Sequence, residues 1–309
     1  MKICIMKKVL AIYYTQSGQL KDILDSTLKP LLNSSDIKID YLKLEPVKDF
    51  PFPWGKEFYN CFPETVLGIP CEMKPFNIDI NVKYDVIVLA HQPWYLSPSI
   101  PIWSFLESNQ AKKLLDGKKI ITLIGARNMW AGAQEIIKRK LHDINASLIG
   151  NIVLQDRTDN VIAAYTIIKW LIHGKKRSSR FLPEAGVSKK DIANSDRFGK
   201  IILDSIQNEQ YKNLQKNLLK SNAVRVKYHL LNMEINARKI FCKFASLAIK
   251  QEKRGEKFRE LAIRFFKVYL IFALFIISPF VSLLFMIIRI LIFPIANNTL
   301  NYYKGIALK

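Results

Sequence analysis

Short aliphatic runs alternate with stretches of helical periodicity through the first half of the chain. Five runs rich in Val, Ile, Leu and Tyr lie at residues 7–15, 37–44, 84–90, 119–124 and 148–154. Apolar residues recur every three or four positions at residues 20–32, 103–115, 132–141 and 159–173. The first pattern is typical of strands buried on both faces, and the second is typical of helices. Together they predict an α/β fold with a doubly wound, five-stranded parallel sheet that binds ligands at the carboxyl ends of its strands.

Three loops at those carboxyl ends carry residues suited to a ligand. The first joins the first strand to the first helix and reads Thr15-Gln16-Ser17-Gly18-Gln19. Its hydroxyls, its glycine and the free N–H groups of a helix start suit a phosphate. The later two loops, at residues 91–98 and 125–130, contribute His91, Pro93, Trp94, Tyr95, Ala126, Arg127, Asn128, Met129 and Trp130. Aromatic planes and polar groups around one rim suit a planar ring with polar edges.

Each of these residues also has an ordinary structural interpretation. A Thr-x-Ser-Gly turn after a strand is often only a helix N-cap, although its place after the first strand of an α/β pattern favours a ligand. His91 fits either a hydrogen-bonded structural residue or a proton carrier. The aromatic residues fit loop anchors packed on the sheet edge, and Arg127 fits a solvated or salt-bridged residue.

The layout resembles a flavodoxin-type FMN-binding domain. The phosphate loop of that family reads Thr/Ser-x-Thr/Ser-Gly-x-Thr, which Thr15, Ser17 and Gly18 match, whereas Leu20 replaces the last hydroxyl. The resemblance implies that residues 15–20 bind the phosphate of FMN and that the next two loops hold its isoalloxazine ring. No G-x-G-x-x-G fingerprint and no P-loop lysine follows a strand in the sequence, which disfavours a nicotinamide or ATP as the tightly bound cofactor.

Longer segments resemble one narrower group, the dialkylresorcinol condensing enzyme family of flexirubin-type pigment clusters. The resemblance spans residues 6–205 and is carried by residues 11–20, 91–101, 127–130, 156–157 and 182–188. It implies FMN-dependent oxidation of a lipophilic cyclohexanedione to a dialkylresorcinol, with a ketosynthase of the same pathway as a partner. For that chemistry we expect Arg127 to steady an enolate and His91 to move a proton. The sequence shows no Cys/His arrangement for a carbon–carbon condensation.

Two other functions fit the same pattern. The three loops would serve equally well in an NAD(P)H-dependent flavin reductase that passes electrons to a membrane quinone. A domain without a cofactor would instead act as a non-catalytic membrane adaptor that recruits other enzymes. Copurification of flavin separates the adaptor from both flavoenzymes.

An aromatic, proline-rich insertion at residues 47–82 separates the second strand from the third. It includes the sequence Phe50-Pro51-Phe52-Pro53-Trp54 and is too aromatic for a solvated linker. Long structured loops in compact domains are commonly functional. We expect a hydrophobic lid over the flavin or, as the alternative, an arm that packs against another part of the protein.

The net charge of +21 is concentrated in the second half of the chain. Residues 1–170 carry 21 basic and 17 acidic residues, a net +4, and residues 171–309 carry 26 and 9, a net +17. Helical composition extends from residue 189 to residue 267, and the 21 residues 268–288 that follow carry no charge. At about 1.5 Å per residue this run would be roughly 31 Å long, enough for a single membrane span. Pro279 near its centre leaves a re-entrant hairpin open.

The basic residues around this run predict how the protein meets a membrane. Seven lysines and arginines lie between residues 250 and 267, and three follow the run. The positive-inside rule then keeps the N-terminal part on the cytoplasmic side of the inner membrane. An anionic membrane surface explains the charge without nucleic acid, for which the sequence has no motif. The expected parts are residues 1–175 as a flavodoxin-like domain, 176–267 as a basic helical extension, 268–296 as a membrane-associated segment and 297–309 as a short tail.

The composition excludes several classes of protein. With 50% hydrophobic and 24% charged residues, the 309-residue chain matches neither a disordered nor a polytopic membrane protein. The four cysteines have no C-x-x-C spacing and the histidines do not cluster, which argues against a disulfide framework or a metal site and favours a reducing compartment. The first eight residues have too short an apolar run for a secretory signal. The sequence is compatible with a homo-oligomer.

Overall fold

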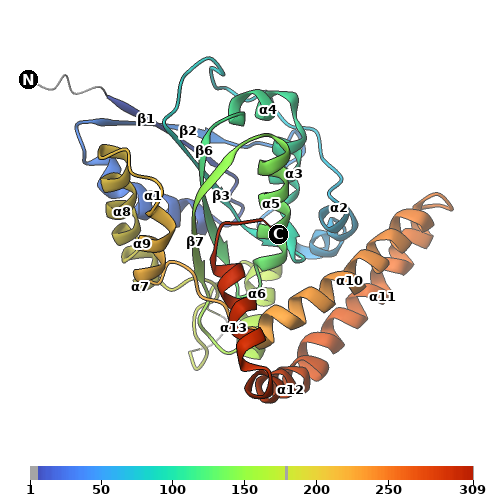
Figure 1. Ribbon diagram of the computed structural model, residues 1–309. Coiled ribbons are helices and arrows are strands. Elements are labelled where there is room, and N and C mark those ends of the chain that lie inside the picture. The colour runs from blue at the N-terminus through green and yellow to red at the C-terminus, as the bar shows by residue number, and fades with distance from the viewer. Residues whose placement is uncertain (1–5, 178–179, 309) are drawn as a thin grey trace, which may run out of the picture.

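A parallel sheet of five strands forms the centre of the protein, which we describe from a computed structural model. The structure describes residues 6–177 and 180–308, except for the side chain of Lys56. The strands are β1 (Lys7–Tyr13), β2 (Ile37–Lys43), β3 (Val86–His91), β6 (Lys119–Ala126) and β7 (Ser147–Gln155). Their order across the sheet is β2-β1-β3-β6-β7, and every neighbouring pair is parallel (Figure 1). Counted along the chain this is the order 2-1-3-4-5 of a flavodoxin-like fold, so the expected fold class is confirmed.

Helices cover both faces of this sheet. Alternate residues of β1 point to opposite sides, with Val9 and Ala11 in one apolar core and Leu10 and Ile12 in the other. The first core is closed by α1 (Gln19–Leu32), α8 (Asp196–Gln207) and α9 (Leu214–Lys220). The second is closed by α3 (Ile100–Glu107), α4 (Asn109–Leu115) and α5 (Ala131–Asp143).

The basic extension expected from residue 176 therefore divides into two parts. Its first helices, α7 (Lys189–Ala193), α8 and α9, lie beside the sheet, and Phe198, Ile202 and Leu218 are fully or almost fully buried in the first core. The amphipathic spacing of α8 is the reason, because its apolar side packs on α1 while its charged side faces solvent. The packing of the sheet domain thus continues well past residue 175.

The second part leaves the sheet as a helical hairpin. Helix α10 (Tyr228–Glu252) runs outward, and α11 (Glu256–Phe272) returns antiparallel to it (Figure 1). The short helix α2 (Phe62–Leu67) of the insertion packs against both, and the rings of Phe62 and Phe266 stack with centroids 3.4 Å apart. The hairpin is therefore fastened to the sheet domain through the insertion.

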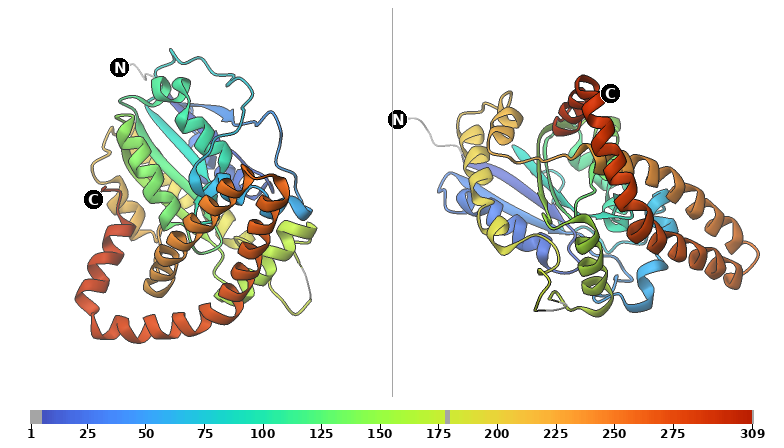
Figure 2. Two further views of the ribbon diagram at one scale, coloured as in Figure 1. Left: turned by 90° about the vertical axis from the view of Figure 1, so that its right-hand side faces the viewer. Right: turned by 90° about the horizontal axis from the view of Figure 1, so that it is seen from below.

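One helix is long and apolar enough to cross a membrane, judged by length and composition alone. It runs over Glu256–Leu291, from α11 through the π-helical segment η2 (Ala273–Ile277) into α12 (Ser278–Leu291). Pro279 lacks an N–H for the helix ladder, and a π-helical turn before it is a recognised cause of bending. Figure 2 (left) shows α11, α12 and α13 (Phe293–Lys304) as three sides of a U with α12 at its base.

The end of the chain packs against α5. The hydroxyl of Tyr302 donates to a carboxylate oxygen of Glu135 on α5 at 2.5 Å. The ammonium group of Lys138 donates to the carbonyl of Ala307 at 3.2 Å. Residues after the apolar run therefore lie against the same sheet domain that precedes it.

Candidate functional site

The three predicted loops meet at one edge of the sheet. Tyr13 pairs with Ala90, and His91 pairs with Ile124, so β1, β3 and β6 end side by side. The ring of Tyr14, just before the first loop, lies 5.8 Å from the ring of Trp94 in the second. A side chain at Gly125 in the third loop would contact Leu20 at 3.2 Å. The three loops therefore form one rim at the carboxyl ends of the strands, which is where folds of this class bind ligands.

The first loop has the donors that a phosphate needs. Gly18 has a φ of 84° and precedes α1, whose first amides lack partners within the helix. The hydroxyl of Thr15 is buried and has no hydrogen-bond partner among the described residues. Leu20, predicted as part of the motif, instead buries its side chain in the first core, so it offers only its backbone amide. The residues present therefore fit a phosphate group.

Two other segments hold this loop in place. The side-chain amide of Gln16 donates to the carbonyl of Pro51 in the insertion at 2.9 Å. Gln19 makes two hydrogen bonds with the backbone of Val187, at 3.1 and 3.0 Å. A side chain at Gly186 would lie 2.5 Å from the amide oxygen of Gln19, so the close approach requires glycine there. Residues 182–188, which carried part of the family resemblance, thus lie beside the first loop.

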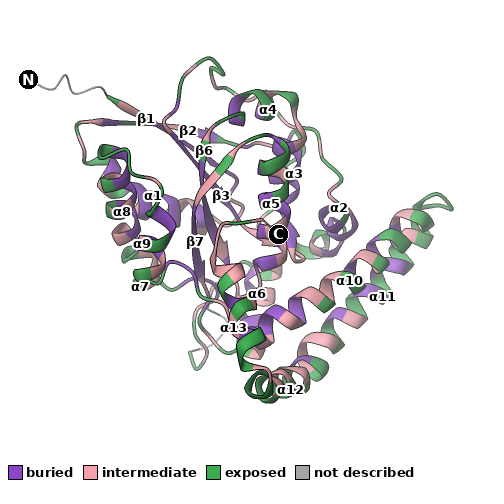
Figure 3. Cartoon of the chain, in the orientation of Figure 1, coloured by how far each residue is buried: buried purple, intermediate pink, exposed green. Residues whose placement is uncertain are grey.

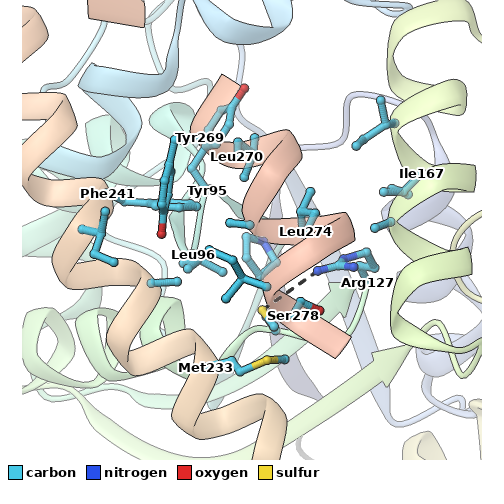
Figure 4. A pocket seen from close by; sticks show the side chains of 18 of the residues that line it. Tyr95, Leu96, Arg127, Ile167, Met233, Phe241, Tyr269, Leu270, Leu274 and Ser278 are labelled. Carbon is cyan, nitrogen blue, oxygen red and sulfur yellow. Dashed lines mark hydrogen bonds between the residues drawn. The ribbon is translucent and has the colours of Figure 1, made fainter. Parts of the chain in front are cut away.

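A cavity of about 350 Å³ lies against the second and third loops. This volume is within the range of small-molecule sites. Its wall combines loop residues with the insertion, α6 (Asn160–His173), α10, α11 and α12, as Figure 4 shows. The loop and insertion residues of the wall are Trp54, Phe58, Pro93, Trp94, Tyr95, Leu96, Arg127 and Met129. The predicted helix after the last strand, α6, is therefore part of the site.

Among the described residues that line the cavity, Arg127 carries the single charge, and most of the others are apolar. The guanidinium group of Arg127 donates to the backbone carbonyl and the side-chain oxygen of Asn160, at 3.1 and 3.2 Å. Asn160 in turn donates to the hydroxyl of Ser278 on α12 at 2.8 Å. Burial lowers the pKa of Arg127 to about 10, so the group stays charged at neutral pH. A developing oxyanion on a ligand would be stabilised here.

The turn that carries Tyr95 and Leu96 is strained. It connects β4 (Pro93–Trp94) to β5 (Ser97–Pro98), and the φ angles of Tyr95 and Leu96 are 46° and 64°. Residues other than glycine rarely adopt this left-handed backbone conformation, which costs about 1–3 kcal/mol for each residue. The strain aims both side chains at the cavity, and Tyr95 donates a hydrogen bond to the carbonyl of Phe58.

Several predicted residues lie elsewhere. His91 is completely buried at the end of β3, outside the cavity wall, and its Nε2 lies 3.3 Å from the oxygen of Gln134. Burial lowers the pKa of His91 to about 4, so it is neutral and its hydrogen bond is structural. The geometry therefore does not place it where it could move a ligand's proton. Trp130 is 2% exposed and Ala126 is 9% exposed, and both belong to the first core.

The two parts of the insertion make different contacts. Trp54 and Phe58 line the cavity, and Trp54 lies 4.8 Å from Trp94 between ring centroids. The next residues form α2, which packs on the α10–α11 hairpin. The insertion is thus a cavity wall at its start and a packing arm at its end.

Two residues that position Arg127, and one buried residue next to the site, were missed by the sequence analysis. Asn160 and Ser278 connect Arg127 to α12, and Glu234 on α10, outside the cavity wall, accepts a hydrogen bond from the amide of Gly132 at 2.7 Å. Burial raises the pKa of Glu234 to about 7. Of these, only Ser278 has a local signal, because it is a polar residue next to Pro279 inside an uncharged run. Among the described residues no group of His, Cys, Asp and Glu could hold a metal ion.

Comparisons with known proteins identify solved structures that are similar to this chain but do not identify a family. No protein-family model and no curated protein matches this chain. A flavoprotein from Lactobacillus acidophilus NCFM in complex with FMN is similar, with 18% identity, a TM-score of 0.38 and coverage of 48% of this chain and 93% of that chain. A flavodoxin from the domain Archaea has 11% identity, a TM-score of 0.38 and coverage of 65% and 99%. Flavodoxin 1 from Bacillus cereus has 13% identity, a TM-score of 0.35 and coverage of 66% and 99%. The fold assignment rests on the strand order rather than on these values.

Proposed function

We propose that this protein is an FMN-dependent oxidoreductase that acts on a lipophilic substrate. The observation that carries the proposal is the position of the cavity, which lies against the second and third loops of the flavodoxin-like rim and extends to the apolar helix α12. Thr15, Ser17 and the amides at the start of α1 would hold the phosphate, and Trp94, Tyr95 and Met129 would hold the ring. The buried, unpartnered hydroxyl of Thr15 supports this placement.

The reaction that we propose is the aromatisation of a cyclohexane-1,3-dione to a dialkylresorcinol. This conversion removes one hydride and one proton from the substrate. Bound FMN would accept the hydride, and the acidic 1,3-dione would release the proton to solvent as it forms the enolate. Arg127 would bind one oxygen of the dione and stabilise it as an enolate, which makes the neighbouring carbon easier to deprotonate. Asn160 and Ser278 would fix the guanidinium group in that position.

The apolar wall supports alkyl-substituted substrates. Ile167, Leu270, Leu274 and Phe241 line the cavity, and Leu270 and Phe241 lie on the side away from Arg127 in Figure 4. A substrate with one oxygenated ring and long chains would place its ring at Arg127 and its chains against these residues. Burial of those chains would exclude water from the ring.

The first test is whether flavin copurifies with the full chain. We expect a visible flavin spectrum from the detergent-purified protein and a loss of about tenfold or more in flavin occupancy in Thr15→Val/Ser17→Ala, which removes two phosphate donors. Ser35→Ala, in the loop after α1, is the matched control and should keep its flavin. A colourless protein that takes up no added FMN would favour the adaptor function.

The second test separates the two flavoenzyme functions. Anaerobic mixing with a dialkyl cyclohexane-1,3-dione should bleach the flavin, and Arg127→Ala should slow this reduction by about a hundredfold while flavin stays bound. Arg127→Lys, which keeps the charge, should lie between the two. Bleaching by NAD(P)H but not by the dione would identify the quinone reductase instead.

A further inference from the structure

The U formed by α11, η2, α12 and α13, residues 256–304, is called the arch below. Its large apolar side chains that are at least half exposed are Phe265, Val268, Phe272, Ile276, Phe280, Leu283, Leu284, Ile287, Ile290, Leu291, Phe293 and Ile295. The described residues bury only 6% of its apolar window, and Figure 3 shows α12 exposed along the base. A soluble monomer rarely exposes apolar surface of this extent, which marks a partner or a membrane contact.

Both ends of the arch are tied to the same side of the protein. At its beginning, Arg259 forms an ion pair with Glu64 at 2.8 Å and donates to the carbonyl of Asn60 at 2.9 Å. At its end, Gln215 on α9 donates to the carbonyl of Lys304 at 2.9 Å, in addition to the contact between Tyr302 and Glu135. A helix that crossed a bilayer would separate these two ends by about 30 Å of hydrocarbon. The contacts at both ends therefore favour a helix that stays on one side of the bilayer over a single crossing.

The middle of the arch is tied to the cavity. The hydroxyl of Ser278 accepts a hydrogen bond from Asn160 at the start of α6, and the side chain of Ser278 is buried. Ala273, Leu274, Val281 and Phe285 face the cavity, whereas Phe280, Leu284 and Ile287 point outward into solvent. The arch therefore has an inner face that completes the site and an outer face without a described partner.

The charged residues of the arch indicate which kind of partner its outer face would bind. The exposed cations of α11 and of the turn before it are Lys253, Arg254, Lys257, Arg264 and Lys267, and α12 adds the exposed Arg289. Glu256 and Glu260 are the exposed acidic residues of the same stretch. An excess of cations along an apolar, in-plane helix fits anionic lipid headgroups above a layer of acyl chains.

We propose that the arch inserts into one leaflet of an anionic bilayer, parallel to its surface, without crossing it. The view from below in Figure 2 (right) shows α11 and α12 on one face of the molecule, as this arrangement requires. Because the inner face of the arch lines the cavity, one layer of helix separates the cavity from the leaflet. The insertion itself does not depend on the proposed flavin chemistry.

Topology gives the decisive test. The full chain carries one cleavable tag at each end and is expressed in a bacterial host, from which sealed inverted membrane vesicles are prepared. In-plane insertion predicts that protease added outside removes both tags, since both lie on the cytoplasmic side. Protection of one tag with loss of the other would show a crossing and overturn the proposal.

Vesicle binding of surface variants tests the outer face. In flotation with vesicles of phosphatidylglycerol and phosphatidylcholine, Phe280→Ser/Leu284→Ser/Ile287→Ser should lower the bound fraction by about tenfold or more. Val47→Ser/Ile69→Ser/Ile80→Ser, which changes three exposed apolar residues of the insertion, should bind like the parent. If the parent protein stays in solution as a dimer and does not bind these vesicles, a second copy of the chain covers the arch and the proposal is overturned.

Discussion

Burial shifts the pKa values of His91 and Glu234 in opposite directions, and in both cases it favours the neutral form of the side chain. It lowers the pKa of His91 to about 4 and raises the pKa of Glu234 to about 7. Both side chains are therefore held near neutrality, where they make structural hydrogen bonds to Gln134 and to the amide of Gly132. Each shift connects folding stability to pH, and the two connections have different signs.

His91 should destabilise the protein in mild acid. Its folded-state pKa lies below the usual 6.5, so the unfolded chain binds the proton first and stability falls as the pH drops from about 6.5 toward 4. The loss amounts to about 2 kcal/mol at about pH 5. Urea unfolding of the parent and of His91→Gln at about pH 7.5 and pH 5 measures it. An equal pH slope in the two proteins would contradict a buried, neutral His91.

Glu234 should act in the other direction. Its folded-state pKa lies above the usual value, so the stabilisation of the neutral, buried carboxyl is complete in acid and is lost as the pH rises through about 7. Relative to the parent, Glu234→Gln should therefore gain about 2 kcal/mol between about pH 5 and pH 8. Thermal unfolding at several pH values measures this gain. A constant difference would mean that the carboxyl ionises normally.

The roles of single residues were the hardest to predict from sequence. The phosphate motif at Thr15, Ser17 and Gly18 was visible because its spacing is local. Leu20 and Trp130 looked like ligand residues, but both bury their side chains in the core of the sheet. Asn160 and Glu234 carried no signal, because their partners Arg127 and Gly132 are 33 and 102 residues away and only the tertiary fold brings them together.

At the scale of helices and strands, the spacing of apolar residues and the length of each segment determined which elements could be predicted. The five strands of the main sheet were predicted from their continuous aliphatic runs, and α1, α5 and α6 from their helical spacing. Residues 103–115 were expected as one helix but form parts of α3 and α4, and α2 of the insertion was not predicted. The basic region after residue 176 was expected as one helical extension, whereas α8 packs beside α1. A charged, amphipathic helix has the same sequence pattern whether it covers a sheet or stands alone, so its neighbour was not predictable.

The α10–α11 hairpin should depend on α2 of the insertion. Phe62 is completely buried and stacks on Phe266, so Phe62→Ala should remove about 3–5 kcal/mol of packing from the hairpin. We expect faster amide exchange in α11, measured by mass spectrometry. Phe105→Ala removes a ring of equal size from the second core and should leave exchange in α11 unchanged. Unchanged exchange in Phe62→Ala would show that the insertion does not fasten the hairpin.

At the scale of the whole molecule, charge and apolar surface act on the same face but over different distances. The 21-residue uncharged run predicted contact with a membrane, but the return of the chain to Glu135 is a long-range contact that no hydropathy pattern contains. Salt screens charges over about 10 Å at 0.1 M and about 3 Å at 1 M, whereas it does not weaken apolar burial. Ionic strength therefore separates the two contributions of the arch.

Binding to anionic vesicles should fall with added salt to a plateau rather than to zero. Each exposed cation near the surface contributes about 1 kcal/mol, so Lys253→Gln/Lys257→Gln/Lys267→Gln should weaken partitioning roughly a hundredfold at low salt. The matched variant Lys38→Gln/Lys48→Gln/Lys112→Gln removes three exposed cations of the sheet domain and should change little. At about 0.5 M salt, all three proteins should converge on the weaker, salt-independent binding to neutral phosphatidylcholine vesicles, because only the outer apolar face of α12 then holds them. Equal losses in the two variants would mean that the net charge of +21, rather than its position beside the arch, directs the protein to the membrane.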